Sequence, residues 1–346
     1  MKFSNGLYHE PGIYFGMPED EYHADCSLGS TDLRNLIVSG LQYYWYSPVN
    51  PTRKPHKDTP ALQYGRAIHK CVLEGRAAFE ERYARKPPKP TEGQLVTTDD
   101  LKQKAVELGI AKSGTKATLI ERILEIDPDA NIYDVEVAKY LSAAGSRTLL
   151  DDDSYDEIIM ASHNITANEH LEHAFHNGLP EVSVFWEQQG IPCKARFDYL
   201  KPRAIVDLKS TRNHLQQIWS VAVANFLARG RYEIQAAHYM NGRTILPLLH
   251  EQGLVHGDHD KKWLKAVAAE PNFQFVFVIY QAEGPPLTYG VIFSKEDDDY
   301  DVANQMIDSA FDRYREGFET YGDEEWVEQG KIEYWNNMDW PMWRGT

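Results

Sequence analysis

The stretch KARFDYLKPRAIVDLKST, residues 194–211, carries the pattern from which the fold can be predicted. Asp198 ends one predicted strand and Asp207 lies in the next, with a turn near Pro202 between them, so a hairpin would bring the two carboxylates together. Side chains alternate along a strand, which places Asp207 and Lys209 on one face. Clustered carboxylates repel each other unless a divalent cation lies between them. The stretch therefore predicts a hard-metal site with a lysine beside it.

Further residues add to this pattern, because an isolated Asp-x-Lys is more often a surface ion pair. The histidine of Gly65-Arg-Ala-Ile-His69 lies on a predicted helix, and Glu181 starts the strand before that of Asp198. Gln235 and Tyr239 stand four residues apart, on one face of another predicted helix. Taken singly, His69 fits a core or surface histidine, and the Gln235–Tyr239 pair fits an ordinary amphipathic helix.

Taken in order, these residues resemble one superfamily. The series GxxxH, Glu, Asp, Asp-x-Lys and QxxxY is similar to the PD-(D/E)XK nucleases, in the RecB/RecE-like branch that includes phage and prophage exonucleases of the exonuclease VIII (RecE) type. Four phrases support the likeness: Ser27–Arg34, Gly65–Gly75, Glu181–Trp186 and Cys193–Asp198. The resemblance implies an α/β (α+β) fold, a restriction-endonuclease-like core with a central mixed sheet flanked by helices.

The resemblance also implies roles for the site residues. The ligands of Mg²⁺ or Mn²⁺ would be His69, Asp198, Asp207 and the Leu208 carbonyl. Lys209 would be the catalytic lysine, with Gln235 and Tyr239 positioning it, water or phosphate. Glu181 would serve a second metal or hold a metal-bound water. The second acid is Asp207, where many members of the superfamily have Glu, and a histidine ligand suits Mn²⁺ at least as well as Mg²⁺.

A different small unit is predicted at residues 94–127. It reads as two short helices, 98–108 and 116–126, with a mini-core of Leu101, Leu108, Leu119, Ile120 and Ile123. It resembles a SAP domain, a small helical DNA-binding module, in which Lys102, Lys116 and Arg122 would contact phosphates. The alternative is a helical hairpin that packs on the nuclease. The expected domains are 1–90 and 131–346 for the nuclease core and 91–130 for the inserted module.

Elsewhere the sequence predicts short elements around this pattern. One helix is expected to start near Ser30 or Thr31. Further helices are expected over 61–82, 156–176, 214–229, 231–241 and 296–318. The expected strands are 12–16, 182–186, 193–199, 204–208, 273–280 and 288–293. Strands with helices before and after them fit the α/β class.

Charge is spread unevenly, although the formal net charge is −16. Residues 295–333 hold 4 basic against 14 acidic side chains, a local net of −10, whereas 194–212 hold 6 against 2, a net of +4. This distribution argues against indiscriminate coating of nucleic acid and allows a local basic track, including Arg196 and Arg212, beside the metal site. The acidic segment reads as a solvated helix face.

A helix N-terminus and the resemblance each suggest how such a protein would hold DNA. Ser30 and Arg34, at a helix N-terminus, would bind a terminal 5′-phosphate, or equally be a helix cap and a surface arginine. Relatives in this branch are thought to form rings around the duplex, which implies a ring-shaped homo-oligomer. The expected basic lining consists of Lys194, Arg196, Lys201, Arg203 and Arg212.

Composition excludes several other classes. The 346 residues are 42% apolar and 25% charged, which excludes a disordered chain or a collagen-like repeat. Three scattered cysteines cannot form a four-cysteine cluster and fit a reducing cytoplasm. No apolar run approaches membrane-spanning length, so no membrane partner is expected. Trp335, Trp340 and Trp343 would dock on the body or on another subunit.

The resemblance thus implies a metal-dependent exodeoxyribonuclease. It would digest linear double-stranded DNA from an end, 5′ to 3′, in phage-type recombination within a bacterial host, alongside a single-strand annealing protein of RecT type. The alternatives are a structure-specific endonuclease of the same superfamily and a non-catalytic DNA-binding or inhibitor protein that keeps the fold. A decayed site should have lost some of Asp198, Asp207 and Lys209, and all three remain.

Overall fold

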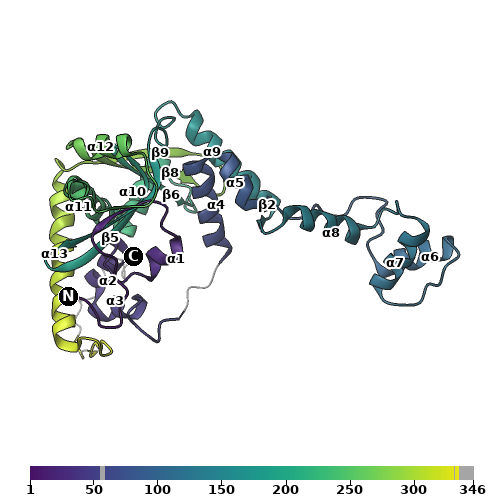
Figure 1. Ribbon diagram of the computed structural model, residues 1–346, viewed down its shortest axis with the longest axis horizontal. Coiled ribbons are helices and arrows are strands. Elements are labelled where there is room, and N and C mark those ends of the chain that lie inside the picture. Colours follow the sequence, from purple (N-terminus) through teal and green to yellow (C-terminus); the bar gives the residue numbers. More distant parts are fainter. Residues whose placement is uncertain (55–58, 331, 335–346) are drawn as a thin grey trace. The chain divides into compact units, whose positions relative to one another are not determined.

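The computed structural model describes residues 1–54, 59–330 and 332–334 (Figure 1). The chain forms two compact units, Met1–Asp58 with Ile165–Thr346, and Thr59–Asn164. The second unit is wider than the predicted insert, because it includes helices on both sides of it. Trp335, Trp340 and Trp343 lie outside the described residues. Among the described residues, no helix is long and apolar enough to cross a membrane.

The first unit is built on a seven-stranded mixed sheet, which confirms the predicted class. Its strands are β1 (Gly12–Tyr14), β4 (Leu179–Gln188), β5 (Ile191–Lys201), β6 (Ala204–Thr211), β7 (Val255–His256), β8 (Gln274–Gln281) and β9 (Thr288–Phe293). Their order across the sheet is β7-β1-β4-β5-β6-β8-β9. Strands β4, β5 and β6 form an antiparallel meander, and β6 pairs in parallel with β8 after a helical crossover.

Helices flank this sheet. They are α1 (Glu19–Ala24), α2 (Ser30–Val38), α3 (Gly40–Tyr46), α10 (Trp219–Gly230), α11 (Tyr232–Glu251), α12 (Lys261–Ala269) and α13 (Asp298–Tyr321). Helix α11 contacts β1, β4, β5 and β8, and α2 and α13 pack against α11 (Figure 1). A single apolar core joins α11 and α13 to the sheet. Burial of one face of α11 therefore fixes the residues that this helix presents to β5 and β6.

The second unit is mainly helical. It contains α4 (Pro60–Glu74), α5 (Arg76–Arg82), α6 (Thr98–Glu107), α7 (Lys116–Ile126), α8 (Tyr133–Ala144), most of α9 (Asp152–Ala167), and the parallel pair β2 (Tyr83–Arg85) and β3 (Thr148–Leu150). The predicted helix pair corresponds to α6 and α7. Leu101, Leu119 and Ile123 are fully buried, and Leu108 and Ile120 pack against them, as expected for the mini-core.

Several expected elements differ in extent. The single helix expected over 61–82 is two helices, α4 and α5, separated by Gly75, whose φ of +90° lies outside the helical region. Helices α8 and α12 were not expected. In contrast, the predicted strand 288–293 coincides with β9. The three strands predicted at 182–186, 193–199 and 204–208 lie inside β4, β5 and β6.

Candidate metal and catalytic site

The site lies where β5 and β6 stop pairing. Their register runs from Lys201 with Ala204 to Tyr199 with Val206 and goes no further. Beyond it, the Asp198 carboxylate accepts a hydrogen bond from the backbone N–H of Leu208, at 2.9 Å. A side chain thus replaces the missing strand partner, and this holds the Asp198 carboxylate between the separating strands.

Asp207 and Lys209 lie together on β6, as the alternation of side chains predicted. The Lys209 ammonium is 2.5 Å from Oδ2 of Asp207, whose side chain has no exposed surface. Gln235 of α11 donates a hydrogen bond from Nε2 to Oδ1 of Asp207, at 2.7 Å. Because α11 supplies this bond, the fit of the helix against the sheet also sets the orientation of the Asp207 carboxylate.

Glu181 enters the site through an irregularity in the sheet. Pro180 pairs with Tyr199 and Val182 with Phe197, so this register places Glu181 opposite Asp198, and the φ of Glu181 is +56°. Positive φ is uncommon for a residue other than glycine and indicates a backbone held by its surroundings. Carboxylate oxygens of Glu181 and Asp198 come within 4.8 Å of each other.

The same irregularity interrupts the side-chain alternation of β5. Phe197 and Leu200 both belong to the main apolar core, although side chains three residues apart in a regular strand point to opposite faces. The interruption falls at Asp198 and Tyr199. The Asp198 side chain, at this interruption, is the one that accepts the hydrogen bond from β6.

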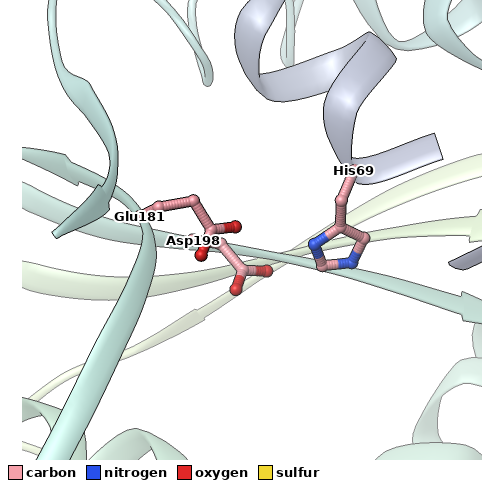
Figure 2. A group of neighbouring side chains, drawn as sticks. All are labelled: His69, Glu181 and Asp198. Carbon is pink, nitrogen blue, oxygen red and sulfur yellow. The ribbon is translucent and has the colours of Figure 1, made fainter. Parts of the chain in front are cut away.

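Figure 2 draws the side chains of Glu181 and Asp198, two candidate metal ligands of the first unit. Carboxylate and imidazole donors of this kind suit Mg²⁺ or Mn²⁺. His69 belongs to the second unit, so its ligation stays a prediction. Within the first unit, Gln235 and Lys209 both contact the Asp207 carboxylate.

Burial and neighbouring charges shift the pKa values in the site. Burial raises the pKa of the Asp198 carboxyl, although the Lys209 ammonium and the Leu208 N–H act against this shift. Burial by itself would lower the pKa of Lys209, but the carboxylates of Asp207 and Asp198 outweigh it and the pKa is raised. Burial, then the Asp207 charge, raises the pKa of Tyr239. At neutral pH the site therefore holds a charged lysine and an un-ionised tyrosine.

The predicted DNA contacts of the first unit are buried or engaged within the protein. Ser30 is the first residue of α2 and is buried. The Arg34 guanidinium donates to the Gly230 carbonyl at 2.8 Å, and Arg212 forms an ion pair with Glu283 at 2.6 Å. About half of the Arg212 side chain is exposed. Whether these residues bind DNA stays a prediction.

Two of the expected lining residues are buried, contrary to the expected exposed surface. The Lys194 ammonium donates to the carbonyls of Tyr22 and Asp25, at 2.9 and 2.6 Å. Arg196 donates to Ser183 and to the Met17 carbonyl, and lies 3.9 Å from Glu181. The reason is that residues 17–25 cover these side chains, which the charge count along the chain could not show.

The cations predicted for the inserted module are also engaged. Lys102 pairs with Asp99 at 3.0 Å and Lys116 with Asp134 at 2.7 Å. Arg122 donates to the carbonyls of Ala111 and Ser113, and so ties down the loop between α6 and α7. These pairs are surface-exposed or half-exposed, and DNA binding by the module stays a prediction.

One neighbour of the site, Tyr232, was not predicted from the sequence. The ring of Tyr232 lies with its centroid 5.4 Å from the Lys209 ammonium. The available signal was spacing, because Tyr232 stands three residues before Gln235 and seven before Tyr239, on the same face of α11.

A family model for a PDDEXK-like domain of unknown function (DUF3799) matches residues 47–246. Among solved structures, a protein from Eubacterium rectale described as a "putative exonuclease" is similar, with 12% identity, 87% of this chain and 86% of that chain covered, and a TM-score of 0.48. A search of curated proteins found no match.

Proposed function

The chain belongs to the family of PDDEXK-like domains (DUF3799), and from this membership we propose that it is a divalent-metal-dependent deoxyribonuclease. The family description supports a nuclease-type function. The observation that carries the proposal is the meeting of Asp198, Asp207 and Lys209 where β5 and β6 separate. Two acids and a lysine at one position of a sheet are the groups that hydrolysis of a phosphodiester requires.

The residues present fit a hard divalent cation. Asp198 and Glu181 offer carboxylate oxygens within 4.8 Å of each other, and Asp207 lies one strand away from Asp198. We propose that these acids, His69 and the Leu208 carbonyl hold Mg²⁺ or Mn²⁺. When bound, such an ion supplies Lewis-acid activation of a phosphate oxygen and a water of lowered pKa.

Three side chains of the site would support the reaction beside the metal ion. The Lys209 ammonium, kept charged by its carboxylate neighbours, would stabilise the negative charge that develops on the attacked phosphate or orient the attacking water. Gln235 would hold Asp207 in one orientation, since its amide donates to one carboxylate oxygen and leaves the other to Lys209. Tyr239, kept un-ionised by burial, would offer a hydroxyl donor beside them.

We further propose linear duplex DNA as the substrate, digested from an end in the 5′ to 3′ direction. The resemblance to RecE-type exonucleases supports this choice, together with phage-type recombination, a ring-shaped homo-oligomer, a RecT-like partner and a cytoplasmic site of action. The SAP-like module would tether the duplex, because its two-helix core is that of a compact helical module.

The test uses end-labelled linear duplex and covalently closed circular DNA of one sequence. The purified protein is incubated with each DNA in Mg²⁺, in Mn²⁺ and with chelator. We expect metal-dependent loss of the linear DNA only. Cutting of closed circles would support the endonuclease alternative, and no cleavage of either DNA with any metal would leave a non-catalytic DNA-binding or inhibitor protein.

A further inference from the structure

We infer that Tyr232 is the positioning residue for Lys209, an inference that rests on the proposed function. The Lys209 ammonium lies over the face of the Tyr232 ring, 5.4 Å from its centroid. The same ammonium is 2.5 Å from Oδ2 of Asp207. A cation at this distance is attracted by the negative face of an aromatic ring. Lys209 is thus held from two directions, by a carboxylate and by a ring.

The ring is held in place by the side chains around it. Phe226 of α10 lies 5.0 Å away, and Phe277 of β8 meets it edge-on at 6.0 Å. The guanidinium of Arg34 lies over the ring, also 5.4 Å from the centroid. Contacts from α2, α10 and β8 therefore leave the ring little freedom to move away from Lys209.

The backbone of the α10–α11 junction is adapted to this ring. A Cβ at position 230 would come within 2.3 Å of the Tyr232 ring, so only glycine permits the observed packing. Arg231 follows with φ +48° and ψ +48°, a left-handed conformation uncommon for arginine. Arg34 then donates to the Gly230 carbonyl at 2.8 Å. This junction has an unfavourable backbone conformation at Arg231 and is held by the hydrogen bond from Arg34. It places Tyr232 at the first position of α11.

An aromatic ring suits this task better than a further acid would. Lysine has a long flexible stem, and a single contact to Asp207 leaves it able to rotate. A second carboxylate would restrain it but would also compete for the divalent cation. A ring face attracts the ammonium without carrying a formal charge, so it orients Lys209 and leaves the ligand set unchanged.

The first experiment compares side chains at position 232. We expect Tyr232→Leu to lower the single-turnover cleavage rate about tenfold, the loss that corresponds to a partly buried cation–π contact. Tyr232→Phe keeps the ring and should stay within about threefold of the wild type. Phe318→Leu is the matched control and should keep the wild-type rate, because it shortens a partly buried aromatic side chain of α13 whose ring packs against Phe3 and Tyr314. DNA affinity should be similar in all four proteins.

A second series separates electrostatics from shape. Phenylalanines with increasing ring fluorination are placed at position 232, since fluorine weakens the negative ring face while shape changes little. We expect the cleavage rate to fall stepwise with fluorination. A rate that is flat across the series would show that the ring only fills space and would overturn the inference.

A third readout does not depend on activity. In protein labelled with ¹³C at lysine Cε, the Lys209 resonance should be shifted by the ring current in the wild type and in Tyr232→Phe, and not in Tyr232→Leu. Lys209→Gln assigns the resonance by its loss. An unshifted wild-type resonance, or full activity of Tyr232→Leu beside an active wild type, would overturn this inference alone. A wild type that cleaves no DNA with any metal would overturn the proposed function and this inference with it.

Discussion

The β5–β6 site and the α6–α7 module both hold many charges, but they hold them differently. In the site, the Asp207 side chain is fully buried and shared between Lys209 and Gln235. In the module, Lys102 and Asp99 form a pair whose side chains are 45% and 89% exposed. Exposed pairs contribute at most about 1 kcal/mol, whereas groups in a buried network depend on one another. The site therefore holds its side chains in fixed orientations, as catalysis requires. In the module, a lysine could leave its carboxylate partner and bind a phosphate with little loss of stability.

The largest effect should come from breaking the buried network. Lys209→Ala or Asp207→Asn should lower the cleavage rate by about a thousandfold or more, because these groups would act on the transition state. For Asp207→Asn, DNA affinity should change little, whereas the unfolding temperature should fall, because the Lys209 ammonium loses its buried carboxylate partner. Lys262→Ala, an exposed lysine on α12, is the control. Near-wild-type cleavage by either site variant would remove this site from consideration.

Acid should destabilise the first unit through His238. Burial lowers the pKa of His238 on α11 to about 4. Between pH 6.5 and 4 the unfolded chain binds a proton that the folded chain does not, so stability falls as the pH falls through this range, by up to about 3 kcal/mol. Urea unfolding followed by tryptophan fluorescence measures this unit, because none of the eight tryptophans lies within 59–164. If His238→Gln keeps the wild-type pH dependence, His238 is not its source.

The next effect in size should be a loss of metal affinity when a candidate ligand is replaced. His69→Ala, Glu181→Gln and Asp198→Asn should each weaken binding of Mn²⁺ by at least about tenfold, which is the lower end of the loss seen even for outer-sphere partners. Calorimetric titration measures the affinity without DNA. His170→Ala, at an exposed histidine, should have no effect. Unchanged affinity for His69→Ala would exclude His69 from the ligand set.

The smallest effect is expected in the module. Neutralising Lys102, Lys116 and Arg122 together should flatten the log–log salt dependence of DNA binding by up to about 3 units if all three touch phosphate. Asp134→Asn frees Lys116 from its partner and should instead strengthen binding by a few fold. Turnover at saturating DNA should stay the same. If neither change alters binding, the module is the helical hairpin that packs on the nuclease.

The sequence predicted those parts of the fold that depend on local pattern. Alternation placed Asp207 and Lys209 on one face of a strand, and helical spacing placed Gln235 on the helix that reaches Asp207. Both follow from periodicity, which neighbouring residues alone determine. The mini-core of the α6–α7 pair was predictable for the same reason.

The parts that were not predicted depend on residues far apart in the chain. The left-handed φ of Glu181 has no signature in a residue of its type, yet it brings Glu181 to Asp198. Lys194 and Arg196 lie in a basic stretch, and only the covering segment of residues 17–25 turns them into buried donors. The helix predicted over 61–82 is divided at Gly75, because a φ of +90° there ends α4.

The hydrogen bond from Leu208 to Asp198 bears on how active and inactive members of such a family are told apart. Removing the Asp198 carboxylate would leave a backbone N–H without its acceptor, so selection for a stable sheet alone would retain this acid. A chain that had lost its chemistry could therefore still carry Asp198. The Lys209 side chain forms an ion pair with Asp207 and lies over the Tyr232 ring, and both partners belong to the site. Its presence is the better criterion for sorting working enzymes from remnants.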